Sequence, residues 1–541
     1  MISRFFSPLA RPYPQGVFLA LAVAAGGLRS EAAWLVFGAL FLVWFSLYAR
    51  DLGSAGLRAP GLFFAWVLTA AIFSPDPAAS AGVFAGYAVL GLVFFLASAH
   101  EEGGRGWLSF VLGIGAAAAA VLLAQKALGA GVTGLIGGNP NYSAAFCAAA
   151  FPAALLAALS GEVKKKKILN AALTLLLGAG IAASGSRGAL LAAFLATTVG
   201  LYSSGYRRAL AAVLAGAAGL ALLSPAALEG FLKFSDPRAF ARPRLWGAAL
   251  EAAAASPLLG WGPGLFERAF EIFKFPYFDG ASYYGHGTLH AHGELFNLAA
   301  EAGFPAALFF LLAAAGGVLR GGAEKLPLRL AALAVFLQGV TDITFYSGAV
   351  GLLFWGSLGF AGSGGEVFVL DQKRRVAIAA LLLAGLALAP AAGLPGGRRA
   401  FLAHSYEEAR SGGNPALTLA LLRISALDKP KDPFTPGAEG RALAAAGNFE
   451  GAAARFRAAL ELEPFYAGAR LGLAGALGAA GRAGECSAEL RALETLPTVP
   501  PRDEYRRALL DYDRAGFVKL RKEICVKKKT GGATAPGRKA R

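Results

Sequence analysis

A long succession of apolar stretches most strongly limits what this chain can fold into. Hydrophobic residues make up 56% of the 541 residues, charged residues make up 16%, and the mean hydropathy is +0.54. Crossing a bilayer takes about 17–25 apolar residues in a helix. About thirteen stretches are roughly long enough, at 17–28, 32–48, 60–74, 80–99, 107–124, 142–160, 168–183, 189–204, 209–224, 304–319, 328–346, 347–362 and 376–395. This composition excludes a water-soluble globule for the first 395 residues. We predict an all-α, polytopic helical bundle of about 12–13 membrane spans.

The basic residues fall mainly on alternate loops between these stretches. With the N-terminus inside, the inner loops hold the basic runs at 164–167, 207–208 and 373–375. Short cytoplasmic loops of membrane proteins retain Lys and Arg, so the asymmetry predicts a multi-pass protein with these basic loops in the cytoplasm. The exceptions on the outer side are Arg29, Lys126 and Arg187. The net charge of +17 therefore reflects topology, and we expect no nucleic-acid partner.

The same orientation places two long polar segments outside the membrane. One is the loop from about 225 to 303, and the other is everything after about 396. The loop is rich in Arg, His and aromatic residues and is too long to be a simple connection. We therefore predict a membrane domain at 1–398 that includes this loop, followed by an extracytoplasmic domain.

An internal repeat organises the C-terminal part. Glycines recur at a spacing of 34 residues, at Gly413, Gly447 and Gly481. Prolines that close helical stretches recur at nearly the same spacing, at Pro430, Pro464 and Pro497. The segment GNFEGAAARFRAALELEPFYAGA resembles a tetratricopeptide unit, which has a period of about 34 residues. We predict a soluble tetratricopeptide-repeat α-solenoid at 399–525 that can bind a protein partner, and a disordered basic tail at 526–541.

The three cysteines carry little information. Cys147 lies in a predicted span, whereas Cys486 and Cys525 lie in the predicted repeat domain. An extracytoplasmic location permits a disulfide. Two cysteines do not make a disulfide framework, however, and we expect them to remain unpaired.

Polar and ionisable residues at the outer ends of the predicted spans form a short set. Such residues cost free energy unless they are paired, so they are functional candidates. The set comprises Asn139, Asn141, Arg187, Arg242, Arg244, His286, His290, His292, Glu301 and Asp342. Arginine guanidinium groups suit phosphate oxygens, and a histidine can remove a proton from a hydroxyl. Together these residues predict an extracytoplasmic site at which an alcohol attacks a diphosphate-linked substrate.

Two stretches in and after the outer loop resemble the signature of the O-antigen ligase and polymerase superfamily, a group of membrane glycosyltransferases. They are RPRLWGAALEAAAASPLLGWGPGLF, which begins at residue 242, and HAHGELFNLAAEAGFPAALFF, which begins at residue 290. The motifs GNPN at 138–141 and SGSRGALL at 184–191 also match. The resemblance covers most of residues 130–360, and its loop part is specific.

The resemblance implies a bacterial glycosyltransferase of the cytoplasmic (inner) membrane that needs no metal and no cofactor. The implied donor is a glycan on undecaprenyl diphosphate, and the acceptor is a hydroxyl of a glycan, lipid or protein. The family's general base falls on His292. Its diphosphate-binding arginines fall on Arg187 and on Arg242 or Arg244. Gly293 stands where the family usually has asparagine, which leaves His290 as a second candidate for the base.

The remaining candidates have structural as well as functional interpretations. We expect Asn141, Glu301 and Asp342 to complete the substrate site. Glu301 alternatively orients the following helix, Asp342 pairs with an arginine, and Asn141 belongs to a turn beside Pro140. His286 offers a metal ligand in principle, but zinc sites generally need further Cys, His or carboxylate ligands.

Three functions stay open at this point. The first is a ligase or polymerase of surface polysaccharide that uses a polyprenyl-diphosphate donor. The second is a protein O-oligosaccharyltransferase of the same superfamily. The third is a non-enzymatic permease or scaffold, which the loop signature disfavours. Analogy of fold alone does not identify the acceptor.

Overall fold

Two compact units make up the part of the chain that the structure describes. The computed structural model describes residues 14–56, 58–223, 229, 241–278, 280–392, 411, 413–497 and 504–523. The membrane unit comprises Met1–Phe266 and His290–Ala392, and the repeat unit comprises Glu267–Leu289 and Gly393–Arg541. Residues 267–289 of the outer loop thus group with the repeats, whereas the sequence placed them in the membrane domain. The predicted tail at 526–541 lies outside the described residues.

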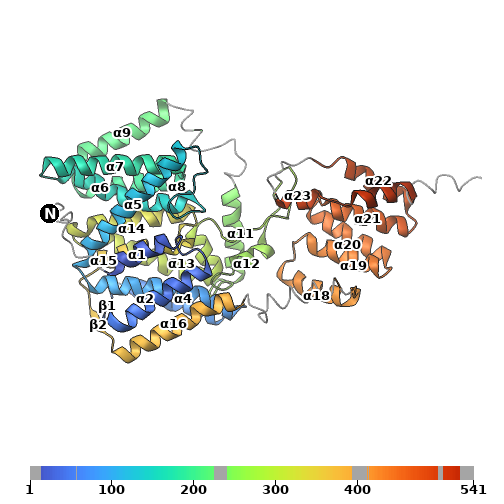
Figure 1. Cartoon of the computed structure of the whole chain (residues 1–541), viewed down its shortest axis with the longest axis horizontal. Coiled ribbons are helices and arrows are strands. Elements are labelled where there is room, and N and C mark those ends of the chain that lie inside the picture. Colours follow the sequence, from blue (N-terminus) through green and yellow to red (C-terminus); the bar gives the residue numbers. More distant parts are fainter. Residues whose placement is uncertain are drawn as a thin grey trace, which may run out of the picture. The chain divides into compact units, whose positions relative to one another are not determined.

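The membrane unit is a bundle of helices that lie side by side (Figure 1). Before the outer loop, the described residues form α1 (Pro14–Ala24), α2 (Glu31–Tyr48), α3 (Arg58–Ile72), α4 (Pro77–Ala99), α5 (Gly103–Ala127), α6 (Pro140–Ser160), α7 (Lys164–Ser184), α8 (Arg187–Ser203) and α9 (Arg207–Leu223). In the loop lie α11 (Ala241–Ala255) and α12 (Phe266–Phe273). After the loop come α13 (Glu294–Leu319), η3 (Ala323–Lys325), α14 (Leu326–Thr341), η4 (Thr344–Tyr346), α15 (Gly348–Ala361) and α16 (Gln372–Ala392). The strands β1 (Asp51–Gly53) and β2 (Val367–Val369) pair antiparallel, with Leu52 opposite Phe368.

Helix length and apolar composition agree with the predicted membrane domain. Among the described residues, six helices are long and apolar enough to cross a membrane, namely α2, α4, α5, α6, α7 and α13. Shorter apolar helices of the same unit are α1, α3, α8 and α15. The expected fold class, a multi-pass helical bundle, is therefore confirmed, whereas the count of 12–13 spans stays a prediction.

The shortest of the late helices is the most enclosed. All 14 residues of α15 are buried. The Trp355 ring lies 4.8 Å from Phe64, 5.5 Å from Phe63 and 5.9 Å from Phe310, measured between ring centroids. Aromatic pairs at such distances stabilise a core beyond the area that they bury. Because protein surrounds α15 throughout, its length is not set by the bilayer thickness.

Local sequence signals explain where the helices at the site begin. Asn139 and Ser186 each accept a hydrogen bond from a backbone N–H in the first turn of the helix that they precede, α6 and α8 respectively. Such N-caps satisfy donors that have no partner inside the helix. Pro140 occupies the first turn of α6, where a missing N–H costs nothing. Gly185 ends α7 at φ 68°, a left-handed conformation that favours glycine. The motifs GNPN and SGSRG are therefore helix starts.

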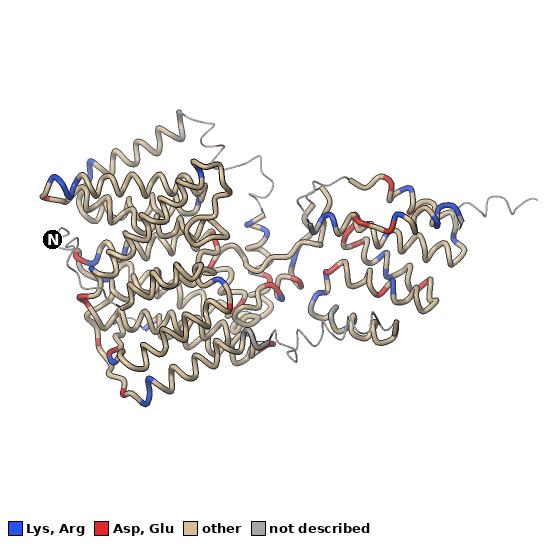
Figure 2. The backbone as a smooth tube through the Cα atoms, in the orientation of Figure 1, with Lys and Arg blue, Asp and Glu red and all other residues tan. Residues whose placement is uncertain are grey.

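Basic residues gather at one end of the bundle. Figure 2 shows Lys and Arg where α7, α9 and α16 begin, which is the same end of the membrane unit. These are the basic runs at 164–167, 207–208 and 373–375. The helices α6 and α8 begin at the opposite end. This arrangement separates the basic loops from the ends that carry the GNPN and SGSRG motifs.

The repeat unit is a stack of paired helices (Figure 1). Its described helices are α18 (Pro415–Asp428), α19 (Phe434–Ala445), α20 (Phe449–Leu462), α21 (Ala467–Ala479), α22 (Ala483–Glu494), α23 (Glu504–Leu510) and α24 (Arg514–Glu523). The 34-residue period has a direct cause, because Gly447 and Gly481 adopt φ 76° and 80° and follow α19 and α21. A continuous core runs through these pairs, with Phe456, Tyr466 and Leu473 buried.

One cysteine expectation was wrong. Cys486 is buried in the core of the repeat unit and is disulfide-bonded, although the sequence analysis predicted no pairing. Cys525 lies outside the described residues. Cys147 is free and buried in α6, as expected for a packing residue.

Candidate active site

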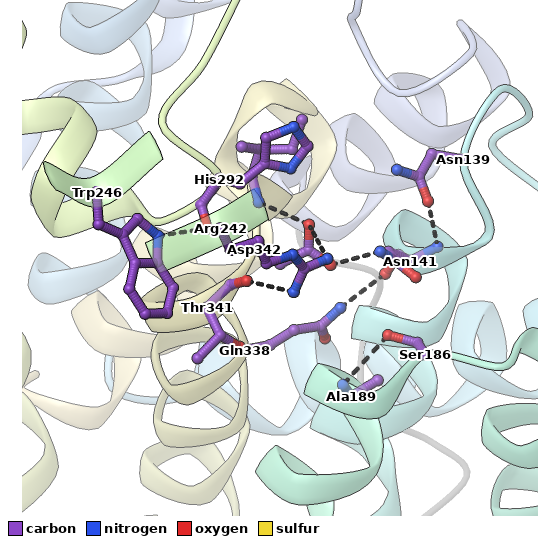
Figure 3. Close-up of polar contacts among 11 residues, drawn as sticks. Asn139, Asn141, Ser186, Ala189, Arg242, Trp246, His292, Gln338, Thr341 and Asp342 are labelled. Atoms are coloured by element: carbon purple, nitrogen blue, oxygen red, sulfur yellow. Dashed lines mark hydrogen bonds and ion pairs between the residues drawn. The ribbon is translucent and has the colours of Figure 1, made fainter. Parts of the chain in front are cut away.

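The candidate site lies where α6, α8, α11 and α13 begin and α14 ends. Figure 3 shows side chains from α6, α11 and the end of α14 directed toward one another, although these elements are far apart in the sequence. Asn141 and Asp342, for example, are 201 residues apart and are hydrogen-bonded. The site is therefore a product of helix packing and not of one contiguous motif.

The GNPN turn supplies the first wall of the site. The Asn139 side chain accepts the backbone N–H of Asn141 at 2.9 Å and so closes the turn around Pro140. The Asn141 side-chain amide donates to Asp342 Oδ2. Gln338 Nε2 donates to the Asn141 carbonyl at 2.9 Å. The start of α6 is thus fixed to the end of α14 through both the backbone and the side chain of Asn141.

Asp342 is the centre of this polar network. Its side chain is only 3% exposed, and Oδ1 accepts the backbone N–H of Ile343 at 2.8 Å. Arg242 Nη2 lies 4.0 Å from the same oxygen. Arg242 Nη1 donates to the Thr341 carbonyl, the last of α14, at 2.7 Å. The buried carboxylate thus has a cation beside it, which offsets the cost of its burial.

Arg187 stands at the first residue of α8, directly after its cap, Ser186. A Cβ added to Gly188 would lie 3.4 Å from Thr341 Oγ1 and 3.5 Å from Gln338 Cγ. The start of α8 therefore packs against the end of α14, and the half-buried Arg187 is the residue next to this contact. Arg187 and Arg242 consequently both belong to segments that meet at the end of α14.

His292 is held in an unusual backbone conformation. Its φ is 55°, in the left-handed region that residues other than glycine rarely adopt. Its carbonyl accepts the indole N–H of Trp246 at 3.2 Å, and that indole stacks on Phe296 with ring centroids 5.0 Å apart. Among the described residues, the buried Nδ1 of His292 has no hydrogen-bond partner. Burial lowers the pKa of His292 below its ordinary value, and Arg242 lowers it further, whereas Asp342 opposes them.

His290 lies on the same turn, and burial lowers its pKa strongly. Its ring centroid is 4.3 Å from that of Tyr346. Burial, assisted by the neighbouring His292, lowers the pKa of His290 to about 4. Between the two histidines, the backbone N–H of Ala291 donates to Asn297 Oδ1 at 3.1 Å. Both imidazoles are therefore neutral near pH 7, the form that accepts a proton.

The glycine that replaces the family's asparagine has a steric explanation. Gly293 precedes α13, and a Cβ added there would lie 2.9 Å from the Val340 carbonyl oxygen and 3.0 Å from Trp246 Nε1. Little room is left for a side chain between these atoms. The space that an asparagine side chain would need after His292 is therefore occupied by Val340, Phe296 and Trp246 in this chain.

Glu301 contacts the GWGPGLF turn at residues 260–266. Its side chain is buried and accepts the backbone N–H of Phe266 at 3.3 Å, while its carbonyl accepts the backbone N–H of Gly262 at 2.8 Å. These contacts hold the GWGPGLF turn against α13. The Glu301 side chain also bonds to Asn297, whose Oδ1 accepts the backbone N–H of Ala291 between the two histidines. These contacts favour the structural interpretation of Glu301.

Two further candidates, His286 and Arg244, differ from these residues in unit or in exposure. His286 belongs to the repeat unit, and its ring packs among Phe270, Phe275 and Tyr277 with centroids 5.7, 5.1 and 5.9 Å away. Arg244 is exposed, whereas Arg242, on the same helix, is half-buried. Among the described residues, no three His, Cys, Asp or Glu lie close enough to hold a metal ion.

Sequence reasoning missed several residues that build the site. Gln338 fixes Asn141, but a single uncharged residue in an apolar helix gives no signal of such a role. Trp246, which holds the His292 carbonyl, lies in the signature stretch RPRLW, yet the sequence alone does not indicate this contact. Arg29 was set aside as an exception to the charge asymmetry. Its guanidinium lies over the Tyr142 ring, 5.8 Å from the centroid, and occupies the space that a side chain at Gly138 would need. A third arginine therefore lies against the GNPN turn.

Comparison with known proteins agrees with this geometry. A family model described as O-antigen ligase matches residues 172–311. The membrane unit carries an O-antigen ligase domain. The matched range includes the candidate residues Arg187, Arg242, Arg244, His290, His292 and Glu301. Asn141 and Asp342 lie outside the range, and packing brings them to this O-antigen ligase domain. The resemblance to O-antigen ligases is thus confirmed for residues 172–311, which lie in a multi-pass membrane protein.

The repeats are confirmed in the same way. A tetratricopeptide-repeat model matches residues 443–506, which run from the end of α19 into α23. A search of curated proteins found no match to the chain. The O-antigen ligase domain is therefore followed along the chain by a solenoid of a type that generally binds other proteins.

Proposed function

We propose that this protein transfers a glycan from a polyprenyl diphosphate to an acceptor hydroxyl at the extracytoplasmic boundary of the bacterial cytoplasmic membrane. One observation carries the proposal. A neutral histidine with an unpartnered buried nitrogen, His292, lies on a turn next to the Arg242–Asp342 pair. This combination supports a mechanism in which a proton acceptor acts beside a fixed cation.

The transfer step follows from these groups. The acceptor hydroxyl gives its proton to the imidazole of His292 while its oxygen forms a bond to the anomeric carbon of the glycan. The bond from that carbon to the diphosphate oxygen breaks, and the electron pair leaves with the polyprenyl diphosphate. The protonated imidazole then returns its proton to solvent. His290 is the alternative base, on the same turn.

The leaving diphosphate gathers negative charge, and the site offers positive groups for it. Arg242 and Arg187 present planar guanidinium donors that match phosphate oxygens. The starts of α6 and α8 add the positive ends of two helix dipoles. We assign Arg242, because this half-buried arginine donates to the Thr341 carbonyl and lies 4.0 Å from Asp342 Oδ1, whereas Arg244 is exposed. Stabilising charge that develops on the leaving group is a large source of rate enhancement.

A second acceptor class deserves a direct test. The tetratricopeptide repeats support a protein acceptor or protein partner, because such solenoids generally present binding surfaces to other proteins. A deletion strain complemented with the wild-type gene separates the two functions. Loss of the surface polysaccharide supports a ligase or polymerase, whereas loss of glycan from a protein supports an O-oligosaccharyltransferase. In both cases the lipid-linked glycan accumulates in the deletion strain, and an unchanged donor pool contradicts the proposal.

The pH dependence of transfer tests whether a histidine of this turn is the base. A base is active only when deprotonated, so the rate is lost as pH falls through its pKa. With His292 as the base, the rate is expected to stay constant as pH falls past about 6.5, the ordinary histidine value, because its pKa is lowered. With His290 as the base, the loss is expected only near its pKa of about 4. Initial rates measured at saturating donor across this range check the prediction, and a loss centred above 6.5 contradicts both assignments.

The topology has its own test. A reporter that is active only outside the cytoplasm, fused after Glu523 at the end of α24, is expected to give a signal. The basic loops at one end of the bundle and the disulfide-bonded Cys486 support this location, because disulfides persist in oxidising compartments. A fusion in the basic run at 164–167 is the matched control and is expected to be silent. The reverse pattern of signals contradicts the proposed orientation.

A further inference from the structure

Residues 267–289 of the outer loop are part of the repeat unit. This stretch, which we call the docked segment, leaves the membrane unit at Phe266 and returns to it at His290. It therefore ends directly before the turn that carries the two candidate bases. The contacts that hold it come from the turns between repeats.

Glu463 makes the most specific of these contacts. Its side chain is completely buried, at 0% exposure. The carboxylate accepts the backbone N–H of Tyr283 at 2.9 Å and that of Gly285 at 3.0 Å, both at Oε2. The backbone N–H of Tyr284 donates to the Leu462 carbonyl at 3.2 Å. Three successive N–H groups of the docked segment are thus bound at the end of α20, two of them by a charged acceptor, which makes a stronger bond than a neutral one.

A second turn of the solenoid binds the same segment. Lys431 Nζ donates to the Lys274 carbonyl at 2.6 Å and lies 5.6 Å from the centroid of the Tyr284 ring. Phe465 stacks on Phe278, with ring centroids 5.6 Å apart and planes 26° apart. Lys431 and Phe465 are 34 residues apart, so they occupy equivalent positions in successive repeats. The docked segment therefore spans two inter-repeat turns.

The docked segment has structure of its own that fits this role. The backbone N–H of Tyr277 donates to the Tyr283 carbonyl at 2.7 Å, which folds the segment back on itself. Lys274 and Glu271 form an ion pair at 2.7 Å, with both side chains less than 10% exposed. His286 fills an aromatic cluster next to these residues. A segment with its own core presents its N–H groups to Glu463 in a fixed arrangement.

We propose that the repeat domain binds residues 274–285 of its own chain, and that this contact holds the turn from His290 to Gly293 in its working conformation. Glu463 is then a positioning residue for the transfer reaction. The second part of the proposal rests on the proposed function, because it takes His292 or His290 as the base. The binding itself does not depend on that function.

The conformation of His292 supplies the physical reason. A non-glycine residue at φ 55° is strained and persists only when its surroundings determine it. Within the membrane unit, the Trp246 indole N–H donates to the His292 carbonyl, and Asn297 accepts the Ala291 N–H. On the N-terminal side, only four residues separate Gly285 from His290. Docking at Glu463 restricts that short connection and so limits the conformations open to the turn.

Hydrogen exchange on the full-length protein in lipid nanodiscs tests the binding without any substrate. In Glu463→Ala, peptides that contain Tyr283 and Gly285 are expected to exchange at least tenfold faster than in wild type. The peptide that contains Ala291 is expected to exchange about threefold faster. Glu461→Ala removes an exposed carboxylate from the same helix and is expected to leave both peptides unchanged. Peptides from α21 and α22 report whether the solenoid stays folded.

Restoring the lost protection in Glu463→Ala distinguishes a positioning role of Glu463 from a general loss of structure in the repeat domain. Glu463→Gln keeps one carbonyl oxygen and is expected to restore most of the protection at Tyr283 and Gly285. A cross-link between cysteines introduced at Phe278 and Phe465 in the Glu463→Ala protein is expected to restore protection at Ala291. Using lipid-linked glycan extracted from a deletion strain as donor, we expect Glu463→Ala to lower kcat about tenfold with an unchanged KM for donor, and the cross-link to return kcat toward wild type.

The binding, the positioning role and the proposed function are each contradicted by a different result. Equal exchange at Tyr283 and Gly285 in wild type and Glu463→Ala overturns the binding. Faster exchange there with an unchanged Ala291 peptide and unchanged kcat overturns the positioning role. A wild-type protein that transfers nothing from the lipid-linked donor overturns the proposed function, and the exchange data still decide the binding.

Discussion

Replacing His292 with alanine is expected to lower the rate of glycan transfer by about 10²–10⁴-fold, the usual contribution of a general base. The neutral imidazole is the proton acceptor in the proposed step, and water is a poorer substitute in a buried site. The initial rate with lipid-linked glycan in purified membranes measures the loss. In cells the same variant is expected to accumulate the lipid-linked donor while the protein remains inserted.

Two other histidines serve as controls for this result. His100 lies outside the site, at the C-terminal end of α4, with Nδ1 2.9 Å from the Leu96 carbonyl. His100→Ala is expected to transfer at the wild-type rate. His290→Ala is expected to lower the rate by no more than about tenfold, through its packing on Tyr346. Nearly full activity in His292→Ala together with its loss in His290→Ala would move the role of base to His290.

The helices of the bundle could be predicted from the sequence, because each one corresponds to a local run of apolar residues. The stretches expected at 142–160 and 168–183 correspond to α6 (Pro140–Ser160) and α7 (Lys164–Ser184). The stretch expected at 17–28 ends earlier, at Ala24, because Gly26 and Gly27 adopt φ 68° and 77° and break the helix. Apolar periodicity thus determines that a helix exists, and caps and left-handed glycines determine where it ends.

The site was predicted in its residue types but not in its connections. The hydrogen bonds from Asn141 to Asp342 and from Gln338 to Asn141 join residues 201 and 197 positions apart. No local pattern encodes such pairs. The choice between Arg242 and Arg244 was equally inaccessible, because it depends on which face of α11 meets the end of α14. The association of 267–289 with the repeats also gave no local signal, because Glu463 looks like any other helix-end carboxylate.

Replacing Arg242 with lysine is expected to lower kcat/KM for the lipid-linked donor about as much as replacing it with alanine. Nη1 donates to the Thr341 carbonyl at 2.7 Å, while Nη2 lies 4.0 Å from Asp342 Oδ1. A planar guanidinium makes both contacts at once, and a single ammonium does not. Losing one hydrogen bond to a charged group costs about 1.5–3 kcal/mol, which corresponds to about 10–150-fold in kcat/KM.

The exposed Arg244 provides the matched control for Arg242→Lys. Arg244→Lys makes the same chemical change two residues away on α11 and is expected to alter kcat/KM by less than about threefold. If the two lysine variants lose activity equally, Arg244 also contacts the donor and the assignment to Arg242 alone is wrong. The double variant with Asp342→Asn adds a further check, because residues of one network act non-additively. Once Arg242 is already lysine, removing the charge of Asp342 is expected to cost less than it does in wild type, since its partner is no longer held in place.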